Sequence, residues 1–464
     1  MKLIILVCCV SCNNSCSTDS AYENIPSYEL GEENLTDDLS IHPASTSLAF
    51  GTQVPGASQH EQLQFATGNS LFNQSWVQAP ASTTGLDGLG PTFNSRACAN
   101  CHLKDGRGKP FEPSNFGSKG FLIRLSIAGV NSHGGPVPVP NYGNQLQNHS
   151  NLNIPIEADI QETFEYQQGT YPDGTTYELR KPNYTFINEN FGSLAGVLIS
   201  PRIGQQTIGL GFIDALPESE ILKNVDEFDA NNDGISGRAN YTWNVQTQTT
   251  EIGKFGWKAN EPSLKQQIAG AFFGDMGLTT SIFNDNTCPP GQEDCYSAPN
   301  GGAPEVTDIQ LDRVLFYQSA LAVPKRRNYK KETVLRGREL FNTVNCKACH
   351  AIDFKTGPYE INPMLSNKNI RPYSDFLLHD MGEGLADNRP DFKANGREWR
   401  TQPLWGIGLI ESVNNHTFLL HDGRARNIEE AILWHGGEAE NSKHKFMNLT
   451  LQERDDLISF IKSL

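Results

Sequence analysis

The stretch RACANCHLKDGRGKPF, residues 96–111, contains two cysteines separated by two residues and followed directly by a histidine. The pentad CKACH, residues 346–350, repeats this pattern near the other end of the chain. The cysteines and histidines of the two pentads are Cys98, Cys101, His102, Cys346, Cys349 and His350. A single pattern of this kind is compatible with a reactive dithiol, a zinc site or an attachment site for haem.

The repetition of the pentad favours haem. Two thiols at this spacing add to the two vinyl groups of a porphyrin, and the adjacent imidazole then binds the iron. Zinc needs four ligands and usually joins two CxxC pairs about 15–20 residues apart, whereas the two pentads are far apart in the chain. A reactive dithiol does not require the histidine that follows both pairs. We therefore predict two covalently bound c-type haems, with His102 and His350 as iron ligands.

The N-terminus, MKLIILVCCVSCNNSCSTDS, indicates export. Lys2 precedes a short apolar run that is too short to span a bilayer, and small residues follow, as in secretory signals. The cluster of cysteines favours a lipoprotein signal with Cys12 acylated, because Ser11 precedes it; an ordinary signal peptide is the alternative. We expect a periplasmic or outer-membrane lipoprotein that is held by its lipid alone, since no later apolar run reaches about 18 residues.

The composition narrows the choice of partners. The chain has 464 residues and a formal net charge of −16. Nucleic acid is therefore not expected as a partner, because its binding depends on clustered Lys and Arg. Cys288 and Cys295 flank the sequence PPGQED, and in an exported protein this pair is expected to form a local disulfide.

Similar sequences precede the two pentads. ATGNSLFNQ (66–74) and LRGRELFNT (335–343) have Gly, Leu, Phe and Asn in the same order. We expect each to be a helix that packs on the last helix of a cytochrome c-like module. Thr450 and Glu453 form a capping box that starts such a helix at the C-terminus.

The predicted fold is mainly α, with two cytochrome c-like helical haem modules. Alternating runs such as GFLIRLSI (120–127) indicate β-hairpin and loop insertions that enlarge the N-terminal module. The expected division is a lipoprotein signal and flexible tether (1–38), an N-terminal cytochrome c-like domain with insertions (39–330) and a C-terminal cytochrome c-like domain (331–464).

Several longer stretches resemble a known family. GLGPTFNSRACANCHLKDGRGKPF, GKFGWKANEPSLKQQIAGAFFGDMGLT and FLLHDGRARNIEEAILWHGGEAE are similar to bacterial di-haem oxidoreductases, which are also labelled thiol oxidoreductases and are related to di-haem cytochrome c peroxidases. The resemblance runs from about residue 60 to the end. It implies two covalent haems, periplasmic exposure and redox chemistry, but no particular substrate. The thiol label conflicts with the predicted chemistry, because thioether bonds to haem consume the CxxC cysteines.

Methionine is scarce, and two of the five methionines lie in an Asp-Met-Gly triplet. We predict that Met276 and Met381 are the distal ligands of the first and second haem, with a buried core methionine as the alternative for each. His379 is the rival ligand to Met381.

A peroxidase would also need an acid–base group near one iron, an electron path and partners for the haem propionates. Candidates for the acid–base group are Glu261, Gln266, His133, His149 and Glu383. Trp257 and Trp405 are candidates for an electron relay, with a structural core aromatic as the favoured alternative. Candidates for propionate binding are Arg371, Arg400 and Arg424.

The stretch DANNDGISGRAN, residues 229–240, matches the front of a calcium-binding loop. Asp229, Asn231 and Asp233 alternate, and Gly234 follows at the sixth position. The twelfth position is Asn240 rather than Glu, so the closing bidentate ligand is missing. An Asx-rich turn is the favoured interpretation and bound calcium the alternative.

The sequence as a whole predicts an exported, peroxidase-like di-haem c-type oxidoreductase. One haem is expected to be the reaction centre and the other to relay electrons. The expected partners are a small periplasmic electron donor, cytochrome or cupredoxin-like, and a small-molecule oxidant. The alternative is a di-haem electron-transfer cytochrome with both irons six-coordinate and no substrate of its own.

Overall fold

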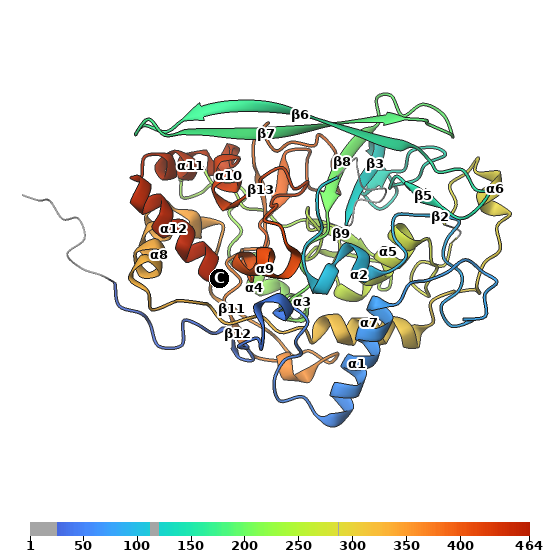
Figure 1. Cartoon of the computed structure of the whole chain (residues 1–464), viewed down its shortest axis with the longest axis horizontal. Helices are drawn as coiled ribbons and strands as arrows, with labels where there is room; N and C mark the ends of the chain where they lie inside the picture. Colours follow the sequence, from blue (N-terminus) through green and yellow to red (C-terminus); the bar gives the residue numbers. More distant parts are fainter. Residues whose placement is uncertain (1–25, 112–119, 286) are drawn as a thin grey trace, which may run out of the picture.

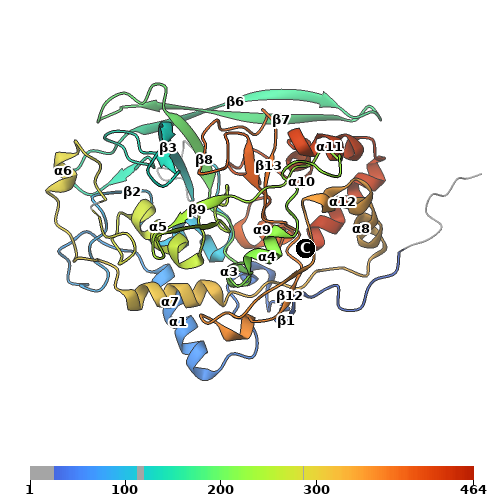
Figure 2. The ribbon, with the colours of Figure 1, turned by 180° about the vertical axis from the view of Figure 1, so that it is seen from behind.

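The computed structural model describes residues 26–111, 120–285 and 287–464. The predicted signal and its Cys12 lie outside these ranges. Figure 1 shows α1 and α7 at the bottom of the molecule and α8, α11 and α12 at its left, with the long hairpin β6–β7 running along the top. Figure 2 shows the same arrangement from behind.

Helices and strands are interspersed along the chain. The α-helices of the described ranges are α1 (Gln59–Asn73), α2 (Cys98–Cys101), α3 (Leu210–Asp214), α4 (Glu218–Leu222), α5 (Leu264–Met276), α6 (Glu293–Tyr296), α7 (Asp308–Ser319), α8 (Glu332–Thr343), α9 (Ile410–Asn414), α10 (Ile428–Leu433), α11 (Glu440–Met447) and α12 (Leu451–Ser463). The strands are β1 (Leu35–Asp38), β2 (Thr92–Phe93), β3 (Phe121–Val130), β4 (Pro136–Val137), β5 (His149–Ser150), β6 (Asp159–Thr170), β7 (Thr176–Ile187), β8 (Leu198–Ile203), β9 (Tyr241–Asn244), β10 (Thr249–Ile252), β11 (Phe354–Lys355), β12 (Asn369–Ile370), β13 (Leu378–Asp380) and β14 (Glu398–Arg400).

The prediction of a mainly α fold is wrong. Helices make up only 29% of the structure and strands 19%, and the strands form several small antiparallel sheets. The insertion between α2 and α5 holds eight of these strands, β3 to β10. In addition, residues 344–409, which lie inside the predicted helical C-terminal module, are mostly loops joined by the short pairs β11–β12 and β13–β14. This stretch is rich in Pro, Gly and Asn, which interrupt the apolar period of a helix.

The helix that precedes the second pentad packs on the last helix, as predicted. α8 crosses α12 at Gly337, where an added Cβ would lie 2.0 Å from the carbonyl oxygen of Asp456. One turn later, the rings of Phe341 and Phe460 are 5.2 Å apart. The predicted capping box of Thr450 and Glu453 starts α12.

The N-terminal half contains an equivalent crossing. α1 packs on α7, and an added Cβ at Gly68 would lie 2.1 Å from the carbonyl oxygen of Arg313. The rings of Phe72 and Tyr317 are 5.4 Å apart. The repeated Gly-Phe pattern therefore marks a repeated helix crossing, one beside each pentad. The main hydrophobic cluster extends from Leu35 to Leu464, and the predicted domain boundaries stay a prediction.

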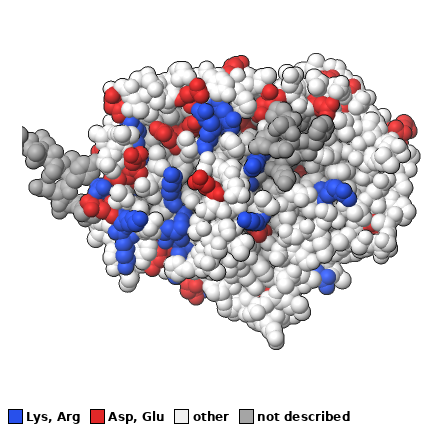
Figure 3. All heavy atoms as spheres, in the orientation of Figure 1, with Lys and Arg blue, Asp and Glu red and all other residues white. Residues whose placement is uncertain are grey.

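The apolar length of the helices and the distribution of charge on the surface both bear on function. Within the described ranges, none of the helices is both long enough and apolar enough to cross a membrane. On the face shown in Figure 3, basic and acidic side chains are interspersed. Mixed charges produce weak net fields, so we expect docking on this face to depend on local contacts more than on long-range steering.

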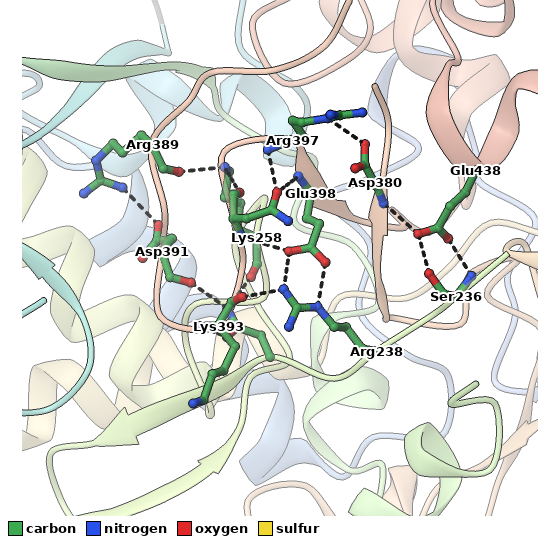
Figure 4. A network of polar contacts seen from close by, with 12 residues as sticks. Ser236, Arg238, Lys258, Asp380, Arg389, Asp391, Lys393, Arg397, Glu398 and Glu438 are labelled. Carbon is green, nitrogen blue, oxygen red and sulfur yellow. Dashed lines mark hydrogen bonds and ion pairs between the residues drawn. The ribbon is translucent and has the colours of Figure 1, made fainter. Parts of the chain in front are cut away.

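A buried polar network holds the β13–β14 hairpin in place (Figure 4). Lys258 donates from Nζ to Asp387 Oδ1 at 2.7 Å and to the carbonyl oxygens of Arg389 and Asn395 at 2.8 and 2.9 Å. The side chains of Lys258 and Asp387 are 0% and 1% exposed. Nearby, Arg238 forms an ion pair with Glu398 of β14. The network fixes the hairpin on whose strands His379 and Arg400 lie.

The crossing of α8 and α12 has no room for a side chain at position 337. We expect Gly337→Ala to lower the free energy of unfolding by about 1–3 kcal/mol, because the helices must separate to admit the methyl group. Gly85→Ala is the matched control, since its added Cβ meets nothing within 4 Å. Denaturant unfolding of both variants measures the difference, and equal stabilities would show that the close crossing is not required.

Removing Lys258 leaves the buried carboxylate of Asp387 without its cation. We expect Lys258→Met to cost about 3–5 kcal/mol of the free energy of unfolding. Lys265→Met is the control, because its ion pair with Asp312 is partly exposed and should contribute about 0–1 kcal/mol. The measurement is again denaturant unfolding, and a loss no larger than that of the control contradicts the role given to this network.

Candidate functional site

The histidines of the two pentads are held in the same way. His102 Nδ1 lies 2.7 Å from the carbonyl oxygen of Gln205, and His350 Nδ1 lies 2.8 Å from that of Tyr373. A carbonyl only accepts, so each Nδ1 carries the proton and each Nε2 keeps a lone pair for a metal. Burial lowers the pKa of His102, and it lowers the pKa of His350 to about 4. Both rings are therefore neutral and ready to act as ligands.

Each pentad lies on a cavity. The N-terminal cavity, of about 190 Å³, is lined by the residues Cys98, Cys101 and His102. The C-terminal cavity, of about 210 Å³, is lined by Cys346, Cys349 and His350. Each cavity thus has the two thiols and the imidazole of its pentad on its wall, which is the donor set that a covalently attached haem requires.

Helix α5 forms one wall of the N-terminal cavity. Its N-cap is Ser263, whose side chain accepts from the amide of Gln266. The cavity-lining residues of α5 lie on one face of the helix and are Leu264, Gln267, Ile268, Ala271, Asp275 and Met276. Gln267 and Asp275 give this wall two polar groups.

The C-terminal cavity is enclosed by elements from both sides of the hairpin β13–β14. Helices α8, α10 and α12 supply an apolar wall. Strands β13 and β14 supply His379 and Arg400, the loop between them supplies Met381, and His435 follows α10. The three segments that carry these side chains are close in space although they are spread over the C-terminal part of the chain.

The four cysteines are not suited to thiol redox chemistry. Burial raises the pKa of Cys98, Cys101 and Cys346 to about 12. Burial also raises the pKa of Cys349. The nucleophile in disulfide exchange is the thiolate, so these thiols stay protonated near neutral pH. The label of thiol oxidoreductase has no support from these sites.

Two buried arginines on the C-terminal cavity lack a carboxylate partner among the described residues. Arg107 Nε and Arg400 Nη1 have no hydrogen-bond partner. Burial lowers the pKa of Arg107 to about 10 and that of Arg400 to about 9. Buried guanidinium groups are stabilised by anions, and the propionates of a haem would supply them. The cavity therefore fits the group that its thiols and imidazole indicate.

The other arginine candidates are placed differently. Arg424 forms a bidentate contact with Asp422, with Nη2 2.8 Å from Oδ2, so its charge is already neutralised. Arg371 is not among the residues that line either cavity. Arg107 was not among the arginines predicted from the sequence, because nothing in its local pattern distinguishes it from a surface arginine.

Trp257 and Gln206 line both cavities and so form their common wall. Trp257 Nε1 donates to the carbonyl oxygen of Ile203 at 2.9 Å, and the guanidinium of Arg107 lies 5.0 Å from the centre of its ring. Trp405, the other relay candidate, lines neither cavity; its Nε1 donates to the carbonyl oxygen of Arg371.

A chain of hydrogen bonds also joins the two sites. Gln205, whose carbonyl accepts from His102, donates from Nε2 to Gln402 Oε1 at 2.7 Å. Arg400 donates from Nη2 to the same oxygen at 2.7 Å. His102 of one cavity is therefore linked through two glutamines to Arg400 of the other.

Both methionines line the cavity for which they were predicted, whereas the rival His379 lines the same cavity as Met381 with both ring nitrogens already bound. Met276 lines the N-terminal cavity and Met381 the C-terminal cavity. His379 has both ring nitrogens bound, to Asp375 at 2.8 Å and to Glu438 at 2.7 Å. Burial alone would lower the pKa of His379, but the nearby acidic groups raise it well above its usual value. His379 is thus not available as a ligand, while ligation by the methionines stays a prediction.

The acid–base candidates chosen from the sequence do not reach either cavity. None of the five candidates lines a cavity; they are Glu261, Gln266, His133, His149 and Glu383. Gln266 donates a hydrogen bond to Glu261, and His133 stacks on Trp243. Gln267 and Asp275 are polar groups on the N-terminal cavity, and sequence reasoning missed them. The helical spacing from Leu264 onward was the signal that could have found them.

Two other predicted sites lie away from the cavities. Cys288 and Cys295 form a disulfide with an S–S distance of 2.01 Å. In the loop of Asp229, the side chain of Asp229 accepts from the amides of Asp233 and Gly234, as in an Asx-type turn. Asn240 is buried and donates to two backbone carbonyls instead of converging on this loop. Calcium binding there stays a prediction.

The comparison with known proteins agrees with the geometry. No curated protein matches the sequence. A family model described as "Di-haem oxidoreductase, putative peroxidase" matches residues 37–464, which is nearly the whole chain and includes both pentads. The chain therefore belongs to the di-haem oxidoreductase family.

Proposed function

We propose that the protein is a peroxidase-like oxidoreductase with two covalently bound c-type haems. The observation that carries this proposal is the pair of cavities with a common wall at Trp257, each with two thiols and an imidazole whose Nε2 is free. Haem bound there supplies an iron that changes oxidation state and, where its sixth position is open, binds a small oxidant.

In this proposal the N-terminal cavity is the reaction centre. Among the described residues that line it, His102 is the only histidine, whereas four histidines line the C-terminal cavity. Asp275 is the acid–base group of this site. Gln145 donates from Nε2 to Asp275 Oδ1 at 2.8 Å, which orients the carboxylate and leaves its second oxygen to hold or transfer a proton.

The C-terminal cavity relays electrons, with Trp257 between the two sites. Trp257 is buried, and the hydrogen bond of its Nε1 to Ile203 fixes the plane of its ring. The electrons come from a small periplasmic donor, a cytochrome or a cupredoxin-like protein, and the oxidant is a small peroxide. Export as a lipoprotein acylated at Cys12 belongs to the same proposal, because attachment of haem c and disulfide formation both take place outside the cytoplasm.

The second candidate is an electron-transfer cytochrome without a substrate of its own. The position of Met276 on the N-terminal cavity favours this alternative, because a thioether ligand to the first iron would close it to peroxide. The two functions differ in one property, which is access of a small molecule to the iron that His102 holds.

The number of covalent haems tests the assignment of the cysteines. We expect the wild-type chain to keep two haems after denaturation and extraction with acid and organic solvent, because thioether bonds survive this treatment. Cys98→Ala with Cys101→Ala should keep one, and so should Cys346→Ala with Cys349→Ala. Mass spectrometry of the denatured chains measures the number, and a wild-type chain free of haem contradicts the proposed function.

Asp275→Asn tests the reaction centre. The amide keeps the hydrogen bond from Gln145 but does not transfer a proton, so we expect peroxide turnover to fall by about 10²–10⁴-fold with both haems retained. Asp233→Asn, in the exposed loop, is the control and should turn over at the wild-type rate. Steady-state assays with hydrogen peroxide and a reduced cytochrome measure the rates. Equal rates for the two variants would contradict an acid–base role of Asp275.

A further inference from the structure

One histidine on the C-terminal cavity has the arrangement of a metal ligand although it lies outside the pentads. His435 Nδ1 lies 2.6 Å from the carbonyl oxygen of Ala431, one turn earlier in α10. No described residue is a partner of its Nε2. His102 and His350 are held in the same way, with Nδ1 bonded to a carbonyl and Nε2 free. The shared arrangement sets the tautomer that leaves Nε2 with a lone pair.

The other two histidines on this cavity are held differently. His379 binds carboxylates through both nitrogens. His421 stacks on Trp399 with their ring centres 3.9 Å apart, and its Nε2 lies 3.6 Å from Asp422 Oδ2. Apart from His350, His435 is therefore the only histidine among the described residues that line this cavity whose Nδ1 is bonded to a backbone carbonyl.

The backbone around His435 is fixed by close packing against β13. An added Cβ at Gly437, which has a φ of +55°, would lie 2.2 Å from the carbonyl oxygen of Asp380. An added Cβ at Gly436 would lie 3.0 Å from that of Met381. Glu438 then accepts from the amide of Asp380 at 3.1 Å and from the side chain of Ser236 at 3.0 Å. These contacts hold the end of α10 against the strand that precedes Met381.

His350 enters the cavity from a different element. It follows the short 3₁₀ helix Cys346–Ala348, and its ring lies 6.1 Å from that of Phe341 on α8. The cavity thus has one free imidazole from the pentad and a second from the segment that follows α10 and packs against β13.

We propose that His435 Nε2 is the sixth ligand of the iron that His350 holds. The proposal rests on the proposed function, because it requires haem in the C-terminal cavity. It replaces Met381 in that role. The bond from Nδ1 to Ala431 orients the His435 ring and increases its basicity, whereas no described contact orients the thioether of Met381. An iron with two imidazole ligands is closed to peroxide and suited to electron transfer.

The test is the electron paramagnetic resonance and optical spectrum of the purified, haem-loaded protein. We expect His435→Gly to lose one low-spin signal per chain and to gain a high-spin signal, and we expect added imidazole to restore the low-spin signal. His435→Met should remain low-spin with the absorption band of a methionine–iron bond and with a higher reduction potential for that haem. Met381→Leu should leave all spectra unchanged.

His444→Ala, on the exposed part of α11, is the matched control and should have wild-type spectra. The inference is overturned if His435→Gly and His435→Met keep the wild-type signals, and Met381 is the ligand if Met381→Leu alone loses the low-spin signal. The count of covalent haems separates these results from failure of the proposed function. A wild-type chain with two haems and unchanged His435 variants refutes only the ligand assignment, whereas a chain without haem refutes the function itself.

Discussion

The hydrogen bond from each pentad histidine to a backbone carbonyl is the interaction on which the rest of the site depends. It fixes the proton on Nδ1 of His102 and His350 and so leaves Nε2 free to bind a metal. The carbonyls belong to Gln205 and Tyr373, which lie in loops far from the pentads in sequence. The long insertion and the loops of residues 344–409 therefore each supply the carbonyl that orients one pentad histidine.

The two cavities are similar in construction and different in chemistry. Both lie beside a helix crossing made close by glycine, at Gly68 and at Gly337. The N-terminal cavity has a polar wall from α5 and a single histidine, while the C-terminal cavity has several histidines and two arginines without carboxylate partners. An open iron in the first site and a closed iron in the second would follow from this difference. Trp257 and the chain of Gln205 and Gln402 connect the two sites.

The sequence predicted the parts of the site that depend on local patterns. Short-range spacing identifies the two pentads, the capped helices and the Gly-Phe crossing. A repeated Asp-Met-Gly triplet likewise identifies Met276 and Met381, which line the two cavities. The mainly α fold was wrong because the strands and loops between the helices have no long apolar period. Arg107 and His435 were missed because tertiary packing, not sequence spacing, places them on the cavities, whereas Gln267 and Asp275 share a helical face with Leu264 that the spacing could have identified. The acid–base candidates failed for the same reason, since a polar side chain near a motif in sequence need not face it.

The central claim is that the two irons are chemically unequal, with only the one held by His102 open to a small oxidant. Electron paramagnetic resonance of the as-isolated wild-type protein, recorded with and without hydrogen peroxide, tests it most directly. The account predicts one high-spin and one low-spin signal, with the high-spin signal converting when peroxide is added. Two low-spin signals that peroxide leaves unchanged would contradict it and would identify the protein as an electron-transfer cytochrome.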